Sequence, residues 1–256
     1  MLKIAISTHK GGAGKTVTAI NLAAGLSRTM KTLLIDLDPQ GHATLGLGVN
    51  VGLSSLTISD VLQDQRMGLE KIIQPVTKNL FLAPANIRLA RVAEMLYAGV
   101  RREERLGLAL SKVRDFDRVV IDCPPSLGTL TINALACADW ILVPCEMGAR
   151  ASDGLVDMLE IVTMLKGADF DQWRIVLTKF DIRKSITNEA VFKGLEPYRQ
   201  RIMRSRVGSS EALNQAQIAG KDIFRFEPNG RGAGFYRDLS GEIVALTRKK
   251  ETIKAI

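Results

Sequence analysis

Seven residues, Lys10-Gly11-Gly12-Ala13-Gly14-Lys15-Thr16, have the types and spacing needed to hold a phosphate group. An apolar run over 2–6 precedes them and a segment of helical periodicity over 17–26 follows, which predicts strand, glycine-rich loop and helix. In such a loop the backbone N–H groups and the positive end of the helix dipole face the anion. We predict that Lys15 contacts the β- and γ-phosphates of a nucleotide and that the Thr16 hydroxyl binds Mg²⁺.

Carboxylates follow two other apolar runs. The run 32–35 leads into Asp36-Leu37-Asp38, and extended geometry places Asp36 and Asp38 on the same side of the chain. The run 118–121 ends at Asp122, the layout of a carboxylate that holds Mg²⁺ through a water. Because the carboxyl ends of parallel strands face the ligand crevice, we expect these acids beside the phosphate loop.

Apolar runs and helical periods alternate along the whole chain, which predicts βα units and a parallel sheet. We expect one domain over residues 1–256, of the α/β class, with a doubly wound, mostly parallel sheet flanked by helices. A Gly/Val/Ser-rich stretch over 46–55 is expected to be a loop. The expected strands are 2–6, 32–35, 80–83, 118–121, 140–143 and 174–177, and the expected helices are 17–26, 87–97, 102–113, 130–137, 152–165, 211–218 and 233–247.

The composition excludes several classes of protein. No secretory leader begins the chain, and no apolar run approaches the roughly 18 residues of a membrane span. Cys123, Cys137 and Cys145 are scattered and odd in number, which favours reduced thiols over a disulfide framework.

The net charge is +8, and basic residues concentrate after Arg174. This bias fits either a polyanionic partner or ordinary solubility charge.

The phosphate loop departs from the strict pattern because Lys10 replaces its first glycine. The form K-G-G-x-G-K-T resembles the deviant Walker A loop of the ParA/MinD family of ATPases. The segment Asp36-Leu37-Asp38-Pro39-Gln40-Gly41 resembles the first switch of ParA proteins, and the segment Asp122-Cys123-Pro124-Pro125-Ser126-Leu127-Gly128 resembles their second switch. The resemblance covers residues 2 to about 246 and identifies the chain as a ParA/Soj-type ATPase.

The resemblance implies roles for the site residues. Lys10 reaches the phosphates of a second subunit, Asp38 orients the attacking water, and Asp36 lies near Mg²⁺. The implied cofactors are ATP and Mg²⁺, and the implied reaction is a slow, partner-stimulated hydrolysis of ATP to ADP and phosphate by a homodimer. The expected catalytic residues are Lys10, Lys15 and Asp38, the expected ATP-binding residues are Lys10, Gly11, Gly12, Ala13, Gly14, Lys15, Thr16 and Val17, and the expected metal-site residues are Thr16, Asp36 and Asp122.

Basic residues near Ser210-Glu211-Ala212 correspond to those with which ParA/Soj proteins bind duplex DNA without sequence preference. The proline and arginine spacing that the family has before this point is absent from 203–209, so solvated surface arginines are the alternative. By the same resemblance, the loops 177–181 and 226–230 are expected near the adenine base. The DNA-binding candidates are Arg183, Arg204, Arg206, Lys221 and Arg225.

The resemblance implies segregation of plasmids or chromosomes with a ParB-like centromere-binding partner, in the cytoplasm on the nucleoid. An N-terminal helix-turn-helix domain is not expected because the chain starts at its first strand. A MinD-like membrane-cycling ATPase would need an amphipathic helix at the end of the chain, and the basic tail 248–256 supports this poorly with two large apolar residues. The same phosphate loop would also suit a positioner of protein cargo, or a small-molecule kinase or synthetase, for which the sequence shows no recognisable second substrate site.

Overall fold

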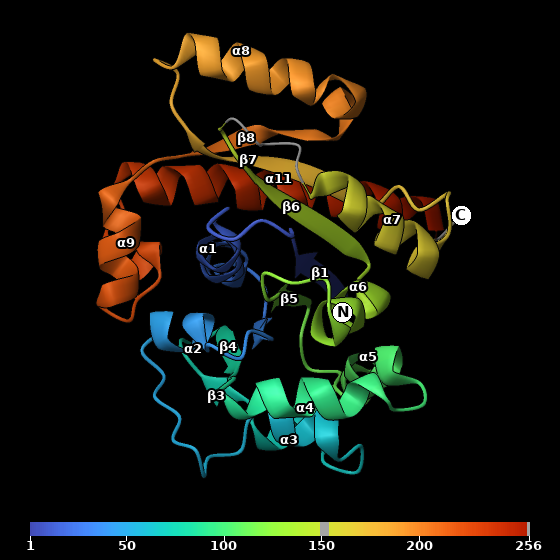
Figure 1. Ribbon diagram of the computed structural model, residues 1–256. Coiled ribbons are helices and arrows are strands. Elements are labelled where there is room, and N and C mark those ends of the chain that lie inside the picture. The colour runs from blue at the N-terminus through green and yellow to red at the C-terminus, as the bar shows by residue number, and fades with distance from the viewer. Residues whose placement is uncertain (149–153, 255–256) are drawn as a thin grey trace.

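A single eight-stranded sheet forms the centre of the molecule (Figure 1). The computed structural model describes residues 1–148 and 154–254, and its strands lie in the order β3-β4-β2-β5-β1-β6-β7-β8. Within these residues the short β3 (Gln74–Pro75) pairs antiparallel with β4 (Leu80–Ala83), and the other pairings are parallel. The predicted doubly wound, mostly parallel sheet is therefore confirmed.

The strand order has a topological switch point next to β1, where successive strands begin to be added on the other side of β1. The chain leaves β1 for β2 and β4, returns to β5 beside β1, and then continues on the other side through β6, β7 and β8. In open α/β sheets, ligands bind outside the carboxyl ends of the strands at such a point. The remaining strands are β1 (Leu2–Ile6), β2 (Thr32–Asp36), β5 (Arg118–Asp122), β6 (Trp140–Glu146), β7 (Trp173–Phe180) and β8 (Ile202–Gly208).

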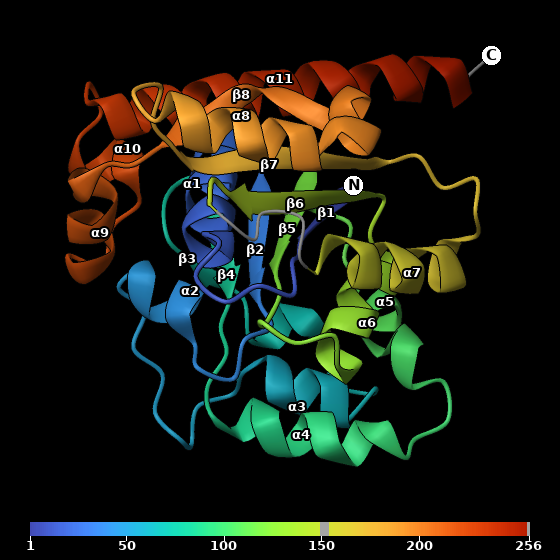
Figure 2. The same ribbon diagram turned by 45° about the horizontal axis from the view of Figure 1, so that its top comes forward.

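Helices cover both faces of the sheet (Figure 2). One face carries α1 (Lys15–Ser27), α2 (His42–Gly46), α9 (Glu211–Ile218), α10 (Ile223–Phe226) and α11 (Arg231–Lys254). The other carries α3 (Ile58–Gln63), α4 (Arg88–Tyr97), α5 (Arg105–Ser111), α6 (Thr129–Cys137), α7 (Leu155–Lys166) and α8 (Ser185–Gly194). Three 3-10 turns, η1 (Leu69–Lys71), η2 (Arg102–Glu104) and η3 (Glu196–Arg201), complete the connections. No helix of the described residues is both long and apolar enough to cross a membrane.

Side-chain alternation along the strands divides the apolar core into two layers. Val119 and Ile121 of β5 pack with the helices of one face, and Val120 packs with those of the other. All three are fully buried. The continuous apolar run of this strand therefore reflects a sheet that is covered on both sides.

Most expected elements are found within one to three residues of their predicted ends. The strand β8 and the helix α8 were not predicted, because Arg204 and Arg206 interrupt the apolar pattern of one and weak helix formers make up much of the other. The helix expected over 102–113 is shorter, since η2 precedes α5. The first residues of the helix expected over 152–165 lie outside the described residues. The loop expected over 46–55 is confirmed from residue 47 onward.

Helix α1 lies between the sheet and α11, and the contact between the two helices depends on Gly25. A Cβ atom at this position would lie 2.0 Å from Ser240 Oγ, 3.1 Å from Ser240 Cβ and 3.3 Å from the Tyr236 carbonyl oxygen. Ser240 is held in place because its hydroxyl donates to that carbonyl at 2.6 Å. The small residue therefore allows α11 to approach the helix that carries the phosphate loop.

We expect Gly25→Ala to lower the free energy of unfolding by about 1–3 kcal/mol, because overpacking outweighs the gain in helix propensity. Gly241→Ala in α11 is the matched control, since no atom lies within 4 Å of its added Cβ. The control is expected to be neutral or to stabilise the chain by up to about 1 kcal/mol. Urea unfolding of both variants measures the difference, and equal effects at the two positions would refute the packing argument.

Candidate nucleotide-binding site

The loop between β1 and α1 has the backbone of an anion site. Gly12 and Gly14 have φ values of 73° and 87°, a region that side-chain-bearing residues rarely adopt. Gly14 is the N-cap of α1, and no side chain caps the helix. The first N–H groups of this 13-residue helix are therefore open to an anion. The Thr178 hydroxyl fixes the back of the loop by donating to the Ala13 carbonyl at 2.9 Å.

Lys15 begins α1 and is directed into the loop. Its ammonium donates to the Lys10 carbonyl at 3.0 Å, and the residue is 7% exposed. Burial lowers the pKa of Lys15, whereas the charges of Asp122, Cys123 and Asp38 act in the opposite direction. A cation held this way favours an anion nearby, and the glycines of the loop leave room for one.

Two fully buried carboxylates lie opposite each other where β2 and β5 end. Asp36 and Asp122 are register partners on these adjacent strands, and Asp38 follows with 7% exposure. Burial and the Asp38 charge raise the pKa of Asp36 to about 6, although hydrogen bonds from Thr44 and Asp38 oppose the rise. Burial and the charge of Asp36 raise the pKa of Asp122 well above its ordinary value. The pair therefore resists double ionisation without a nearby cation.

Asp122 fits a magnesium site better than Asp36 does. Both Asp122 oxygens are buried without a hydrogen-bond partner among the described residues. The Thr16 hydroxyl opposes the rise of the Asp122 pKa, although its geometry falls short of a hydrogen bond. Both oxygens of Asp36, in contrast, already accept protein donors. Residues 1–148 and 154–254 contain no group of three or more His, Cys, Asp or Glu side chains that could hold a metal ion alone. Mg²⁺ does not need such a group, because it usually combines one or two protein ligands with substrate phosphates.

Lys10, the residue that replaces the first loop glycine, is held within its own chain. Its ammonium lies 3.4 Å from Oε2 of Glu146, the last residue of β6, and Lys179 Nζ lies 3.0 Å from Oε1 of the same carboxylate. Burial raises the pKa of Glu146, but the two lysines outweigh it and leave the pKa lowered. Glu146 was not predicted as a site residue, and its one sequence signal is its place at the end of a buried strand.

A cleft of about 710 Å³ extends from the phosphate loop across the first switch segment. Its lining includes Gly12, Lys15, Thr16 and Asp38. A second cavity of about 150 Å³ adjoins it and has the apolar and amide groups that suit a base. That cavity is lined in part by Thr178, Lys179, Ser210, Asn214 and Tyr236.

The two loops expected near the base have different positions. Thr178 and Lys179 of the loop 177–181 line the smaller cavity. Residues 226–230 line neither of these cavities. The segment 207–210 and Tyr236 also line the smaller cavity, and the sequence did not point to them because they come from the end of β8, the turn after it and the start of α11. The positions of both loops relative to a base stay predictions.

The candidate DNA-binding residues lie on three separate segments. Arg183 makes a two-pronged ion pair with Asp181 before α8, and Arg225 pairs with the buried Asp222 at α10. Arg206 stacks over the rings of Phe180 at 4.5 Å and Phe192 at 5.3 Å. Arg204 and Lys221 are exposed, the first on β8 and the second between α9 and α10. These contacts hold three of the five cations in place at the surface, and their role in DNA binding stays a prediction.

Comparison with known proteins assigns the family. Residues 1–173 match the family described as AAA domain. The chain is 36% identical over 247 residues to the sporulation initiation inhibitor protein Soj of Bacillus subtilis, which covers 94% of this chain and 98% of Soj. It is 35% identical over 258 residues to the chromosome partitioning protein ParA of Myxococcus xanthus, which covers 98% of this chain and 89% of ParA. The chain belongs to the AAA-domain family of ParA and Soj partition ATPases.

Two solved structures of this fold contain a bound adenine nucleotide. The ParA-type chain superposes on an ATP complex of a McdA variant from Cyanothece with a TM-score of 0.84 and 26% identity, over 96% of each chain. Cobyrinic acid a,c-diamide synthase of Mycobacterium smegmatis, solved with ADP and magnesium, gives a TM-score of 0.76 and 28% identity, over 91% of this chain and 97% of the synthase. Relatives of ParA-like fold therefore bind adenine nucleotides, and one does so with magnesium.

The buried carboxylates generate a prediction on stability. At Asp36 and Asp122 the raised pKa values mean that the folded chain binds more protons than the unfolded chain above about pH 4, so the contribution of these two groups to the free energy of unfolding falls as the pH rises through their folded pKa values. Asp122→Asn removes one such charge. We expect this variant to match the wild type below about pH 4 and to exceed it increasingly as the pH rises toward 8, by about 1–3 kcal/mol, in the absence of nucleotide and metal.

Urea unfolding from about pH 3.5 to 8 measures the effect. Asp115→Asn is the control, because Asp115 is an exposed aspartate and its replacement should leave the pH profile unchanged. An Asp122→Asn profile parallel to the wild type at every pH would contradict the account of the buried pair.

Proposed function

We propose that this chain is an ATPase that dimerises on ATP, binds duplex DNA without sequence preference, and segregates plasmid or chromosomal DNA with a ParB-like partner in the cytoplasm. The observation that carries the proposal is the second lysine of the phosphate loop, Lys10. Its backbone carbonyl accepts a hydrogen bond from Lys15, whereas its ammonium pairs with a carboxylate of its own, Glu146. The names of two ParA relatives, chromosome partitioning proteins of Myxococcus xanthus and Caulobacter vibrioides, support the segregation role.

In the proposed mechanism the triphosphate binds to the loop amides of residues 11–16, and Lys15 neutralises part of its charge. Thr16 and Asp122 would hold Mg²⁺, and the bound ion would neutralise charge that develops on the phosphates. Asp38, at the mouth of the cleft, accepts a hydrogen bond from the attacking water and orients it. Hydrolysis without a partner is expected to be slow, as the resemblance to ParA/Soj-type ATPases implies.

The second step brings two ATP-loaded chains together through their nucleotide faces. Lys10 leaves Glu146 and donates to the phosphates of the other chain, where its charge acts like that of an arginine finger. The dimer unites two sets of basic residues, so that affinity for DNA and its dependence on salt both increase with the number of phosphate contacts. Hydrolysis, stimulated by the ParB-like partner, removes the anion that Lys10 contacts and releases the dimer.

We expect Lys10→Ala to bind ATP with a Kd within about threefold of wild type but to lose ATP-dependent dimerisation and hydrolysis, since Lys15 and the loop amides are retained. Glu146→Gln is the matched variant, because it removes the same ion pair and keeps Lys10. It should still dimerise on ATP. Sedimentation velocity and phosphate release measure both variants, and full turnover by Lys10→Ala would refute the role of this lysine in the partner's site.

DNA binding tests the basic surface. Arg204→Ala combined with Arg206→Ala should weaken binding to a random-sequence duplex in the presence of a slowly hydrolysed ATP analogue and lower the salt slope by about two per chain. Arg91→Ala with Arg114→Ala removes the same charge from exposed positions on α4 and before β5, and should leave the slope unchanged. Equal slopes for the two double variants would contradict the proposed surface. ATP affinity should stay the same in both.

A further inference from the structure

Asp36 organises the backbone of the segment that carries Asp38. Its Oδ1 accepts the Asp38 N–H at 3.0 Å, and its Oδ2 accepts both the Thr44 N–H at 2.8 Å and the Thr44 hydroxyl at 2.7 Å. Asp36 and Thr44 are each buried to 1% exposure or less. The position of Asp38, the residue proposed to orient the attacking water, therefore depends on how Asp36 and Thr44 are held together.

The Thr44 hydroxyl also reaches a different part of the chain. While it donates to Asp36, it accepts the backbone N–H of Ala85 at 3.0 Å. A hydroxyl has one donor and two acceptor positions, so both bonds form at once. The same stretch contacts Gly41 from the other side, since a Cβ at Gly41 would lie 3.0 Å from the Ala85 carbonyl oxygen. The switch segment thus lies against residues 84–88, which connect β4 to α4.

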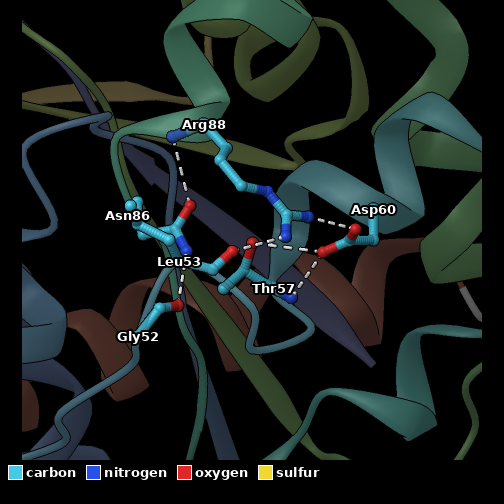
Figure 3. Close-up of polar contacts among 6 residues, drawn as sticks. All are labelled: Gly52, Leu53, Thr57, Asp60, Asn86 and Arg88. Atoms are coloured by element: carbon cyan, nitrogen blue, oxygen red, sulfur yellow. Dashed lines mark hydrogen bonds and ion pairs between the residues drawn. The ribbon is translucent and has the colours of Figure 1, made fainter.

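Residues 84–88 also hold a surface loop (Figure 3). The Asn86 side-chain amide donates to the Gly52 carbonyl at 3.1 Å, and Arg88 Nη1 donates to the Leu53 carbonyl at 2.8 Å. The second guanidinium nitrogen of Arg88 pairs with Asp60. Asp60 in turn accepts the Thr57 N–H at 2.8 Å and forms the capping box of α3.

Two more contacts close this connection. The Ile58 N–H donates to the Pro84 carbonyl at 2.9 Å, and Arg88 N–H donates to the Asn86 side-chain oxygen at 3.2 Å. The loop of residues 47–57 also follows α2 directly, and α2 contains Thr44. The loop is therefore attached to the switch segment twice, once through the chain and once through residues 84–88.

We propose that Thr44 and Arg88 are positioning residues that couple the loop 52–57 to Asp36 and Asp38, so that the state of the nucleotide site and the state of this surface loop change together. The coupling runs from Asp36 to the Thr44 hydroxyl, to Ala85, and through Asn86 and Arg88 to the carbonyls of Gly52 and Leu53. The loop exposes Leu53 to 67% and Leu56 to 45%, so a contact made there by another molecule would be transmitted to the position of Asp38. The inference rests on the proposed ATPase function for its catalytic consequence.

Hydrogen exchange of a peptide covering 50–58 tests the coupling directly, because the amides of Thr57 and Ile58 donate to Asp60 and Pro84. In the wild type, ATP with Mg²⁺ should slow exchange in this peptide. Arg88→Gln should abolish that response while the Kd for ATP stays within about threefold, whereas Arg91→Gln, an exposed arginine on the same helix, should retain it. An unresponsive loop in a wild-type chain that binds ATP, or an intact response in Arg88→Gln, would overturn the proposal.

A second arm needs no nucleotide. Thr44→Val keeps the shape of the side chain but removes both hydroxyl bonds, and it should raise exchange over 50–58 in the free chain, whereas Thr44→Ser should restore wild-type exchange. Unchanged exchange in Thr44→Val would overturn the coupling whether or not the chain hydrolyses ATP. Failure of the wild-type chain to bind ATP would count against the proposed function alone.

Turnover distinguishes coupling from separate structural damage. Arg88→Gln and Thr44→Val should each lower kcat more than they raise KM, and the double variant should be less impaired than the product of the single effects by about two- to tenfold. Strictly multiplicative effects would contradict a shared path.

Discussion

The structure of the site depends on the unfavourable free energy of placing two ionised carboxylates at the buried ends of neighbouring strands. Asp36 and Asp122 face each other across β2 and β5 without solvent, and Asp122 has no hydrogen-bond donor among the described residues. Only a nearby cation makes two ionised carboxylates favourable in such surroundings. Lys15 supplies one positive charge on this side of the loop. The excess negative charge that remains lowers the free energy of unfolding at neutral pH and favours the binding of a metal-bound triphosphate. Lys15 and the loop amides balance the negative charge of that triphosphate.

The fold supplies this arrangement through ordinary features of a parallel sheet. The switch point beside β1 brings the ends of β1, β2 and β5 together, and two glycines with positive φ allow the loop to fold over them. Gly25 lets α11 approach α1, which keeps the helix that begins at the loop buried. Glu146 at the end of β6 holds Lys10 in an ion pair. Contacts that begin at Asp36 extend through Thr44 to the surface near Leu53.

Much of this organisation was accessible from the sequence. The loop Lys10–Thr16 and the acids at strand ends predicted both the sheet and the position of the crevice, because glycine spacing and apolar runs report local backbone geometry. Glu146, Tyr236 and Thr44 could not be found in this way. Their partners are distant along the chain, as with Thr44 and Ala85 or Lys10 and Glu146, and local patterns hold no information on such pairings. β8 was not predicted for a related reason. Its Arg206 interrupts the apolar pattern of the strand, and this arginine is held there by stacking on Phe180 and Phe192, which are distant along the chain.

If the buried carboxylates require a metal-bound nucleotide, then neither the metal nor the nucleotide alone should stabilise the chain fully. The thermal midpoint of the chain with Mg²⁺ alone, ATP with EDTA, and ATP with Mg²⁺ tests this requirement most directly. We expect a small shift for either component alone and a rise of about 5–10 °C for the two together at about 100 times the Kd, since binding to the folded state adds about 2.7 kcal/mol. A full shift produced by ATP in EDTA would contradict the requirement for the metal.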